Sequence, residues 1–291
     1  MIFEDKREQV IENIRQAAEK GVFDAKVEVN DPKLTAQQLE KLLDDHVKKR
    51  PSMRFCIDSW IARQITNSAT KIINKTTKII GLENVGQITG GAILTSNHFS
   101  QIDNTVLRTF TRKMGKKKLF VVSQDTNLAM SGWVGFLLNY ADTVPISFNR
   151  SYMSGRFAPM LKELLDAGNY VLIYPEQEMW FNYRKPRPLK RGAYYYAAEF
   201  NVPVISCFVE MRDLDEMDRP NFYKVQYILH VLPPIFSDPA KNIRENSIAM
   251  CEQDYRQKKA AYEAAYGKPM DYRFEPDDIA GWKYGSNNHG Q

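Results

Sequence analysis

The stretch AILTSNHFSQIDNTVLRTF, residues 92–110, decides how the rest of the chain is interpreted. Residues 92–94 form an apolar run that predicts a buried strand, and residues 105–110 have the pattern of a helix start. His98 therefore lies where a strand ends and a helix begins, which in open α/β sheets is the edge that binds ligands. Asp103 follows five positions later, close enough for its carboxylate to fold back onto the imidazole.

This spacing of histidine and aspartate suits general base chemistry. A neutral imidazole accepts a proton from a hydroxyl near pH 7, and a carboxylate on its other nitrogen fixes the tautomer and stabilises the imidazolium. No serine or cysteine nucleophile is needed if an acceptor hydroxyl itself attacks. Taken alone, the spacing is a weak signal, because a capped helix with His98 as an ordinary loop residue has the same pattern.

Composition excludes several classes of protein. The 291 residues suit one large domain or two small ones, and the net charge of +5 with a pI of about 8.9 suits phosphate-bearing ligands or an anionic surface. That charge is too small and too evenly spread to predict nucleic-acid binding. Three distant cysteines favour buried thiols in a reducing compartment, and neither a signal peptide nor a membrane-spanning run is expected.

From residue 77 onward, strand and helix patterns alternate. This predicts an α/β fold with a mainly parallel mixed sheet flanked by helices, preceded by an N-terminal helical extension. The expected division is a helical segment at 1–75 that packs on the catalytic domain, an α/β domain at 76–235, and a C-terminal helix and tail at 236–291. Strands are expected at 78–80, 92–94, 119–122, 144–147, 170–174, 202–209 and 225–231, and helices at 5–20, 35–49, 54–74, 104–114, 133–140, 154–167, 192–200 and 239–266.

One predicted helix, at 54–74, carries large apolar side chains on a single face: Ile57, Trp60, Ile61 and Ile65. We expect this face to pack on the core. The alternative is that it rests on a membrane surface, aided by the flanking Arg54 and Arg63.

The remaining histidines predict no metal site. His46 lies on a polar helix and is expected to be solvated, His230 is expected to be an ordinary packed residue of a strand, and His289 lies in the tail. None of them clusters with cysteine at zinc spacing, so no metal is expected. The glycines do not form a nucleotide-binding or dinucleotide-binding loop, so no cofactor is expected either.

Two further stretches carry candidate site residues. YPEQE, residues 174–178, closes a buried strand, and Glu176 there could bind a substrate hydroxyl, hold a catalytic loop or merely cap a helix. NYRKPRPLKRG, residues 182–192, holds five cations between stiffening prolines, which suits a phosphate, although a solvated loop has the same composition. Arg150, just after a predicted strand, is another candidate phosphate ligand.

Together these stretches resemble the glycerolipid acyltransferase family, which includes lysophosphatidic acid acyltransferases. The motifs occur in the family's order between about residues 78 and 210: Asn97-His98-x4-Asp103, Phe148-Asn149-Arg150, Tyr174-Pro175-Glu176, and Lys190-Arg191-Gly192-Ala193 with Val202-Pro203-Val204-Ile205. Two departures stand out. The third motif continues Gln177-Glu178-Met179 where the family has Gly-Thr-Arg, and the second lacks its leading glycine.

The resemblance implies transfer of a fatty acyl group from acyl-CoA or acyl carrier protein to the hydroxyl of a lysophospholipid or glycerol-phosphate-type acceptor. It implies a role for each of these residues: His98 as general base, Asp103 as its orienting partner, Glu176 as a positioner of the acceptor, Arg150, Lys190 and Arg191 as phosphate ligands, and Arg184 and Arg187 as substitutes for the missing arginine. The run 116–118 is a predicted docking patch for the anionic donor.

Lipid substrates further imply a cytoplasmic protein that sits peripherally on the inner face of the membrane. Three alternatives remain open: an acceptor without phosphate, such as a glycolipid; hydrolysis of the thioester; and a membrane-surface lipid-binding protein without turnover.

Overall fold

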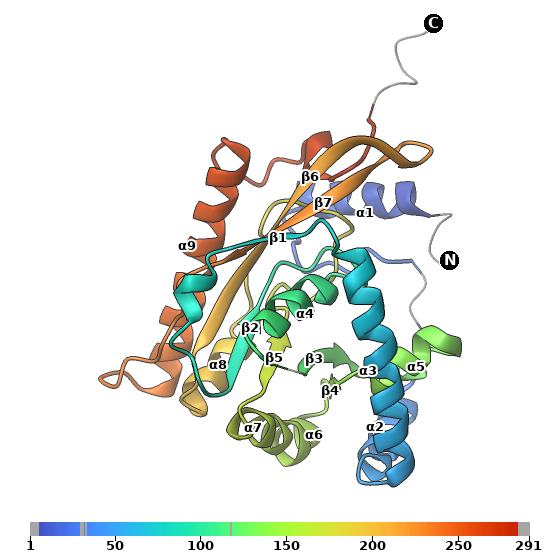
Figure 1. Ribbon diagram of the computed structural model, residues 1–291, viewed down its shortest axis with the longest axis vertical. Coiled ribbons are helices and arrows are strands. Elements are labelled where there is room, and N and C mark those ends of the chain that lie inside the picture. Colours follow the sequence, from blue (N-terminus) through green and yellow to red (C-terminus); the bar gives the residue numbers. More distant parts are fainter. Residues whose placement is uncertain (1–5, 30–31, 33, 117, 285–291) are drawn as a thin grey trace, which may run out of the picture.

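The computed structural model describes residues 6–29, 32, 34–116 and 118–284, and their centre is a seven-stranded sheet of order β1-β7-β6-β2-β5-β3-β4 (Figure 1). Neighbouring strands pair in parallel except for β6 and β7, which are antiparallel. The predicted mainly parallel mixed sheet with flanking helices is therefore confirmed. The strands are β1 (Lys78–Ile80), β2 (Ala92–Thr95), β3 (Leu119–Gln124), β4 (Thr143–Ile146), β5 (Tyr170–Ile173), β6 (Val204–Arg219) and β7 (Phe222–Val231).

The central strands are apolar on both faces because helices cover both sides of the sheet. On β2, Ile93 faces the cluster formed with α7, α8 and α9, whereas Leu94 faces the cluster formed with α4. The helices are α1 (Arg7–Glu19), α2 (Ala36–Lys49), α3 (Met53–Ile73), α4 (Asn104–Lys113), α5 (Gly132–Tyr140), α6 (Arg150–Tyr152), a π-helical turn (Met153–Phe157), α7 (Ala158–Asp166), α8 (Gly192–Glu199) and α9 (Ile243–Tyr266).

Strand β6 is longer than its sequence pattern predicts. The apolar pattern stops near residue 211, but backbone pairing with β7 continues to Arg219, with register shifts on either side of Met217. The outer half of this hairpin is exposed and charged, so its backbone hydrogen bonds and not its side chains define it as a strand.

Helix α2 begins with the predicted capping box, in which Thr35 and Gln38 exchange side-chain and backbone hydrogen bonds. The prediction that His46 is solvated is wrong. This side chain is buried because α2 turns it edge-on toward Phe55 at the start of α3, with ring centroids 5.5 Å apart. Burial, followed by the nearby cations, lowers the pKa of His46 to about 4.

Helix α3 also contradicts its prediction. Its large apolar side chains face solvent, with Ile57 52% exposed and Trp60 59% exposed. The opposite face, which packs toward α4 and α5, buries only small side chains: Ala62, Thr66 and Thr70. Small residues allow close helix packing, which leaves the large stripe outside. Cys56 on this helix is exposed too, whereas Cys207 and Cys251 are buried as predicted.

Within the described residues, no helix combines the length and the apolar character that crossing a membrane requires.

Candidate active site

His98 lies in the loop between β2 and α4, at the carboxyl edge of the sheet. Its Nδ1 atom is 2.7 Å from Oδ2 of Asp103, the residue that precedes α4. The backbone N–H groups of Phe99 and Ser100 donate to the same oxygen, at 3.1 and 3.3 Å. The Asp103 side chain is 2% exposed and that of His98 21% exposed. An Nδ1–H donated to a fixed carboxylate leaves Nε2 as the basic nitrogen, and no hydrogen bond among the described residues occupies it.

Tyr174 completes this pair, and the sequence did not predict its role. Its ring stacks on the imidazole, with centroids 4.0 Å apart and planes 13° apart, and its hydroxyl donates to Oδ1 of Asp103. Burial, followed by the negative charge of Asp103, raises the pKa of Tyr174 well above its usual value, so the hydroxyl stays a donor. The available signal was its place just after β5, which pairs with β2 in register.

Glu176 ties the histidine loop to the segment that follows β5. Its Oε2 atom accepts from the backbone N–H of His98 at 3.1 Å and from Nη2 of Arg187 at 2.8 Å, and its Oε1 accepts from the Arg187 backbone at 2.9 Å. Both side chains of the ion pair are at most 2% exposed. Of the roles that the sequence left open for Glu176, this geometry matches the holding of a catalytic loop.

The guanidinium of Arg187 donates its hydrogen bonds to other groups of the protein. Its Nη1 donates to the carbonyl of Phe23 at 2.9 Å, and Nη2 also donates to the carbonyls of His98 and Glu178. The guanidinium lies over the Trp180 ring, 4.7 Å from its centroid. These contacts join three distant segments of the chain, and they favour a structural role over the predicted binding of phosphate.

Most cations of the loop at 182–192 face carboxylates as well. Arg184 pairs with Asp213, and Lys185 with the buried Asp278, as the loop packs against the C-terminal segment. Lys190 pairs with Asp24 at 2.6 Å. Arg191, in contrast, lines a hollow of about 360 Å³ between α8 and α9 together with Arg244.

Two other predicted contacts lie away from His98. Arg150 is exposed at the start of α6, beyond the edge strand β4. Lys116 donates to the carbonyls of Gly90 and Gly168, which precede β2 and β5, so it lies at the opposite edge of the sheet from His98. Lys117 of the same predicted docking patch lies outside the described residues. The structure thus brings together His98, Asp103, Glu176 and Arg187. Arg150, Arg191 and Lys116 lie elsewhere, and the side chain of Lys190 is paired with Asp24.

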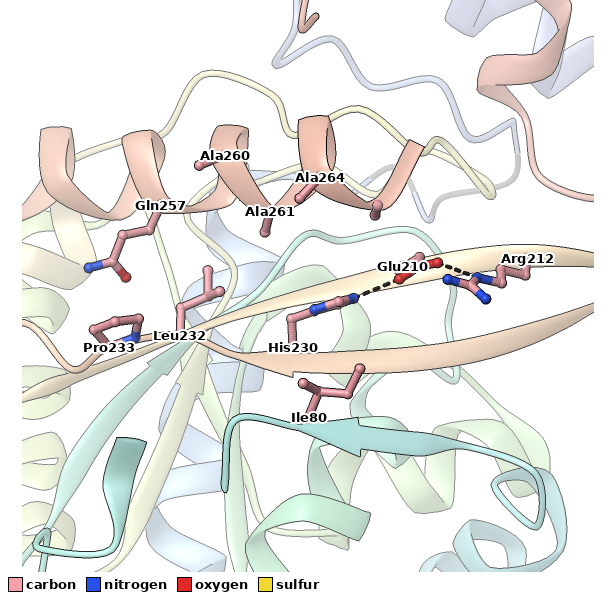
Figure 2. A pocket seen from close by; sticks show the side chains of 11 residues that line it. Ile80, Glu210, Arg212, His230, Leu232, Pro233, Gln257, Ala260, Ala261 and Ala264 are labelled. Atoms are coloured by element: carbon pink, nitrogen blue, oxygen red, sulfur yellow. Dashed lines mark hydrogen bonds and ion pairs between the residues drawn. The ribbon is translucent and has the colours of Figure 1, made fainter. Parts of the chain in front are cut away.

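A second hollow, of about 420 Å³, lies on the other side of the sheet from α4, between α9 and the β6–β7 pair (Figure 2). There His230 Nε2 is 2.7 Å from the buried carboxylate of Glu210, which also pairs with Arg212. His230 is a strand residue, as predicted, and it packs beside Phe208. Alanines of α9 form the opposite wall in Figure 2, so the hollow has an apolar side and a polar side.

Metal-ligand spacing occurs once in the part of the chain that the structure describes, at Glu275, Asp277 and Asp278. Lys268 and Lys185 pair with these carboxylates, so the group is an ion-pair cluster.

The model of the family described as Acyltransferase matches residues 76–210, a range that contains every residue of the arrangement around His98. Residues 76–210 belong to the acyltransferase family. The resemblance predicted from the four motifs is thereby confirmed, and with it acyl transfer as the class of reaction.

A matching solved structure is the 1-acyl-sn-glycerophosphate (LPA) acyltransferase PlsC from Thermotoga maritima, with 15% identity and a TM-score of 0.49 over 80% of this chain and 97% of that one. No curated protein matches the chain.

Proposed function

We propose that this acyltransferase moves a fatty acyl group from a thioester, carried by coenzyme A or acyl carrier protein, to a hydroxyl of a glycerolipid-type acceptor. The observation that carries the proposal is the pairing of His98 with Asp103 at the sheet edge, with Nε2 left open, inside a domain of the acyltransferase family. The reaction requires no metal or redox group.

In the proposed mechanism, His98 Nε2 takes the proton of the acceptor hydroxyl as the oxygen attacks the thioester carbonyl. Asp103 stabilises the imidazolium that forms. Collapse of the tetrahedral intermediate breaks the carbon–sulfur bond, and the imidazolium returns the proton to the departing thiolate. Tyr174 and Glu176 act through their contacts with Asp103 and the His98 backbone, so we assign them as positioning residues.

A membrane surface is the proposed location of this reaction. Its support is the exposed stripe of α3, in which Ile57 is 52% and Trp60 59% exposed, together with Trp133 of the adjoining α5, which is 61% exposed. Arg54, at 92% side-chain exposure, lies on the same helix, and its weak contact with Asp58, at 3.8 Å, leaves the guanidinium accessible to an anionic headgroup. Pelleting with anionic vesicles at low salt tests this: we expect wild type to pellet and a Trp60→Ser, Ile57→Ser variant to remain in solution. If the wild-type protein does not pellet with the vesicles, the proposal is overturned.

The activity itself is tested with purified protein, acyl-CoA and acyl carrier protein donors, and a panel of lysolipids. Ester product that requires both donor and acceptor is the expected result. Release of free acid at the same rate without acceptor identifies a thioester hydrolase instead, and intact thioester with every acceptor identifies a protein without turnover.

A further inference from the structure

The charge beside the proposed base is negative. Glu176 is neutralised by Arg187, but the neighbouring Glu178 receives only the amide of Gln124, whose Nε2 donates to its Oε1 at 2.9 Å. An amide carries no charge, and within the described ranges no cation pairs with this carboxylate. Its second oxygen, Oε2, has no partner among those residues and can accept a further hydrogen bond.

The backbone of Glu178 lies close to that of His98, at the same edge of the sheet. A single atom, Nη2 of Arg187, donates to the backbone carbonyls of both residues. Two residues further on, the backbone of Trp180 donates to the His98 carbonyl at 3.1 Å. Gln124 is the last residue of β3, on the far side of β5 from β2, so it holds the carboxylate over the carboxyl ends of the central strands.

The described cations that could neutralise this charge are either paired with other carboxylates or distant from it. Arg184, Lys185, Arg187 and Lys190 each pair with a carboxylate. Arg108, the buried cation beside Tyr174, donates to Asn104 and to the carbonyl of Ala141, and it shares the carboxylate of Asp142 with Arg63. Arg150 follows β4, three strand spacings from β2, which is about 14 Å. Arg191 lines the hollow against α9, on the face of the sheet away from α4. A phosphate next to the reacting hydroxyl would therefore lie on the side of the sheet edge that carries the charge of Glu178, where the described cations of residues 184–190 are already paired.

We propose that Glu178 is a specificity-determining residue that selects an uncharged polyol acceptor, in which a second hydroxyl near the reacting one donates to Glu178 Oε2, and that it disfavours a phosphate monoester at that place. A glycerol lipid and a sugar lipid share this chemistry. The inference rests on the proposed function and names its acceptor class.

The test compares three acceptors with one common acyl chain: a monoacylglycerol, a monoacylated hexose lipid and a 1-acylglycerol 3-phosphate. They are presented in neutral detergent micelles with acyl-CoA or acyl carrier protein as donor, and kcat/KM is measured for each. We expect wild type to prefer a neutral acceptor by about tenfold or more, and Glu178→Gln to reduce that ratio about tenfold because one charge at short range is lost. The control Glu252→Gln removes an exposed charge of α9 and should leave the ratio unchanged.

Thermal melting establishes that Glu178→Gln is folded, and Glu178→Thr provides a second neutral variant. Preference of wild type for the phosphate monoester, or an unchanged ratio in both folded variants, overturns this inference while leaving acyl transfer intact. Absence of transfer to all three acceptors overturns the proposed function as well. The relative rates of the two neutral acceptors distinguish glycerol from sugar.

Discussion

Two histidines of this chain face a buried carboxylate with nearly the same local geometry. The nitrogen–oxygen distance is 2.7 Å for both His98–Asp103 and His230–Glu210, and in both pairs the carboxylate is 2% exposed. The histidine side chains are 21% and 20% exposed. Distance and burial therefore do not distinguish them.

What differs is the surroundings. Asp103 receives two backbone N–H groups and the Tyr174 hydroxyl at the edge of a parallel sheet, so it is fixed without a competing cation. Glu210 shares its charge with Arg212 within an antiparallel strand pair. A proposed base is therefore recognised by its place in the sheet and by the groups that bind its carboxylate.

Replacing each histidine gives the largest expected contrast. His98→Ala should lower kcat by about 10²–10⁴, the usual contribution of a general base, whereas His230→Ala should stay within about twofold of wild type. Initial rates of ester formation measure both, with circular dichroism to establish folding. A folded His98→Ala protein of full activity would contradict the proposed mechanism. Equal losses of kcat in the two variants would show that His98 and His230 do not differ in function.

The arginines beside the two pairs sharpen the contrast in stability. Arg187→Met leaves the buried carboxylate of Glu176 without its cation, so the free energy of unfolding should fall by about 3–5 kcal/mol. Arg212→Met removes a partner whose side chain is 57% exposed, so the change should be below about 1 kcal/mol. Urea denaturation gives both values. Similar losses in the two variants would contradict the structural role assigned to Arg187.

A third histidine, His46, is buried, its Nε2 has no hydrogen-bond partner among the described residues, and its pKa is lowered to about 4. Between about pH 6.5 and pH 4 the unfolded chain binds a proton at this residue and the folded chain does not. The free energy of unfolding therefore decreases as the pH is lowered through that window. From pH 7 to pH 5 the expected loss is about 2 kcal/mol. Urea titrations of wild type and His46→Leu measure it; an equal pH slope in the variant would assign the effect elsewhere.

The smallest expected effect concerns Tyr174, which has no counterpart beside His230. Tyr174→Phe keeps the stacked ring but removes the hydrogen bond to Asp103, so kcat should fall about tenfold, equivalent to about 1.4 kcal/mol. Tyr227→Phe, near Phe99, is the matched control and should leave kcat unchanged. An unaltered rate in Tyr174→Phe would separate the tyrosine from catalysis.

Much of the fold was predictable because the central strands are continuous apolar runs and the helices have regular caps. The register that sets β5 beside β2 was not predictable, and it is this register that brings Tyr174 and Glu176 to His98. The direction in which α3 faces was also predicted wrongly, because a stripe of Ile and Trp has the same period whether it packs inward or lies outside.

By itself the sequence determined the alternating α/β pattern, the four ordered motifs and the pairing of His98 with Asp103, because these depend on residues close together in the chain or on local periodicity. Folding, in contrast, sets which carboxylates the cations of residues 184–190 pair with, and it leaves Glu178 without a cation among the residues that the structure describes. Their partners, such as Asp24, Asp213 and Asp278, lie far away in sequence, and a charge is neutralised by what folding places next to it.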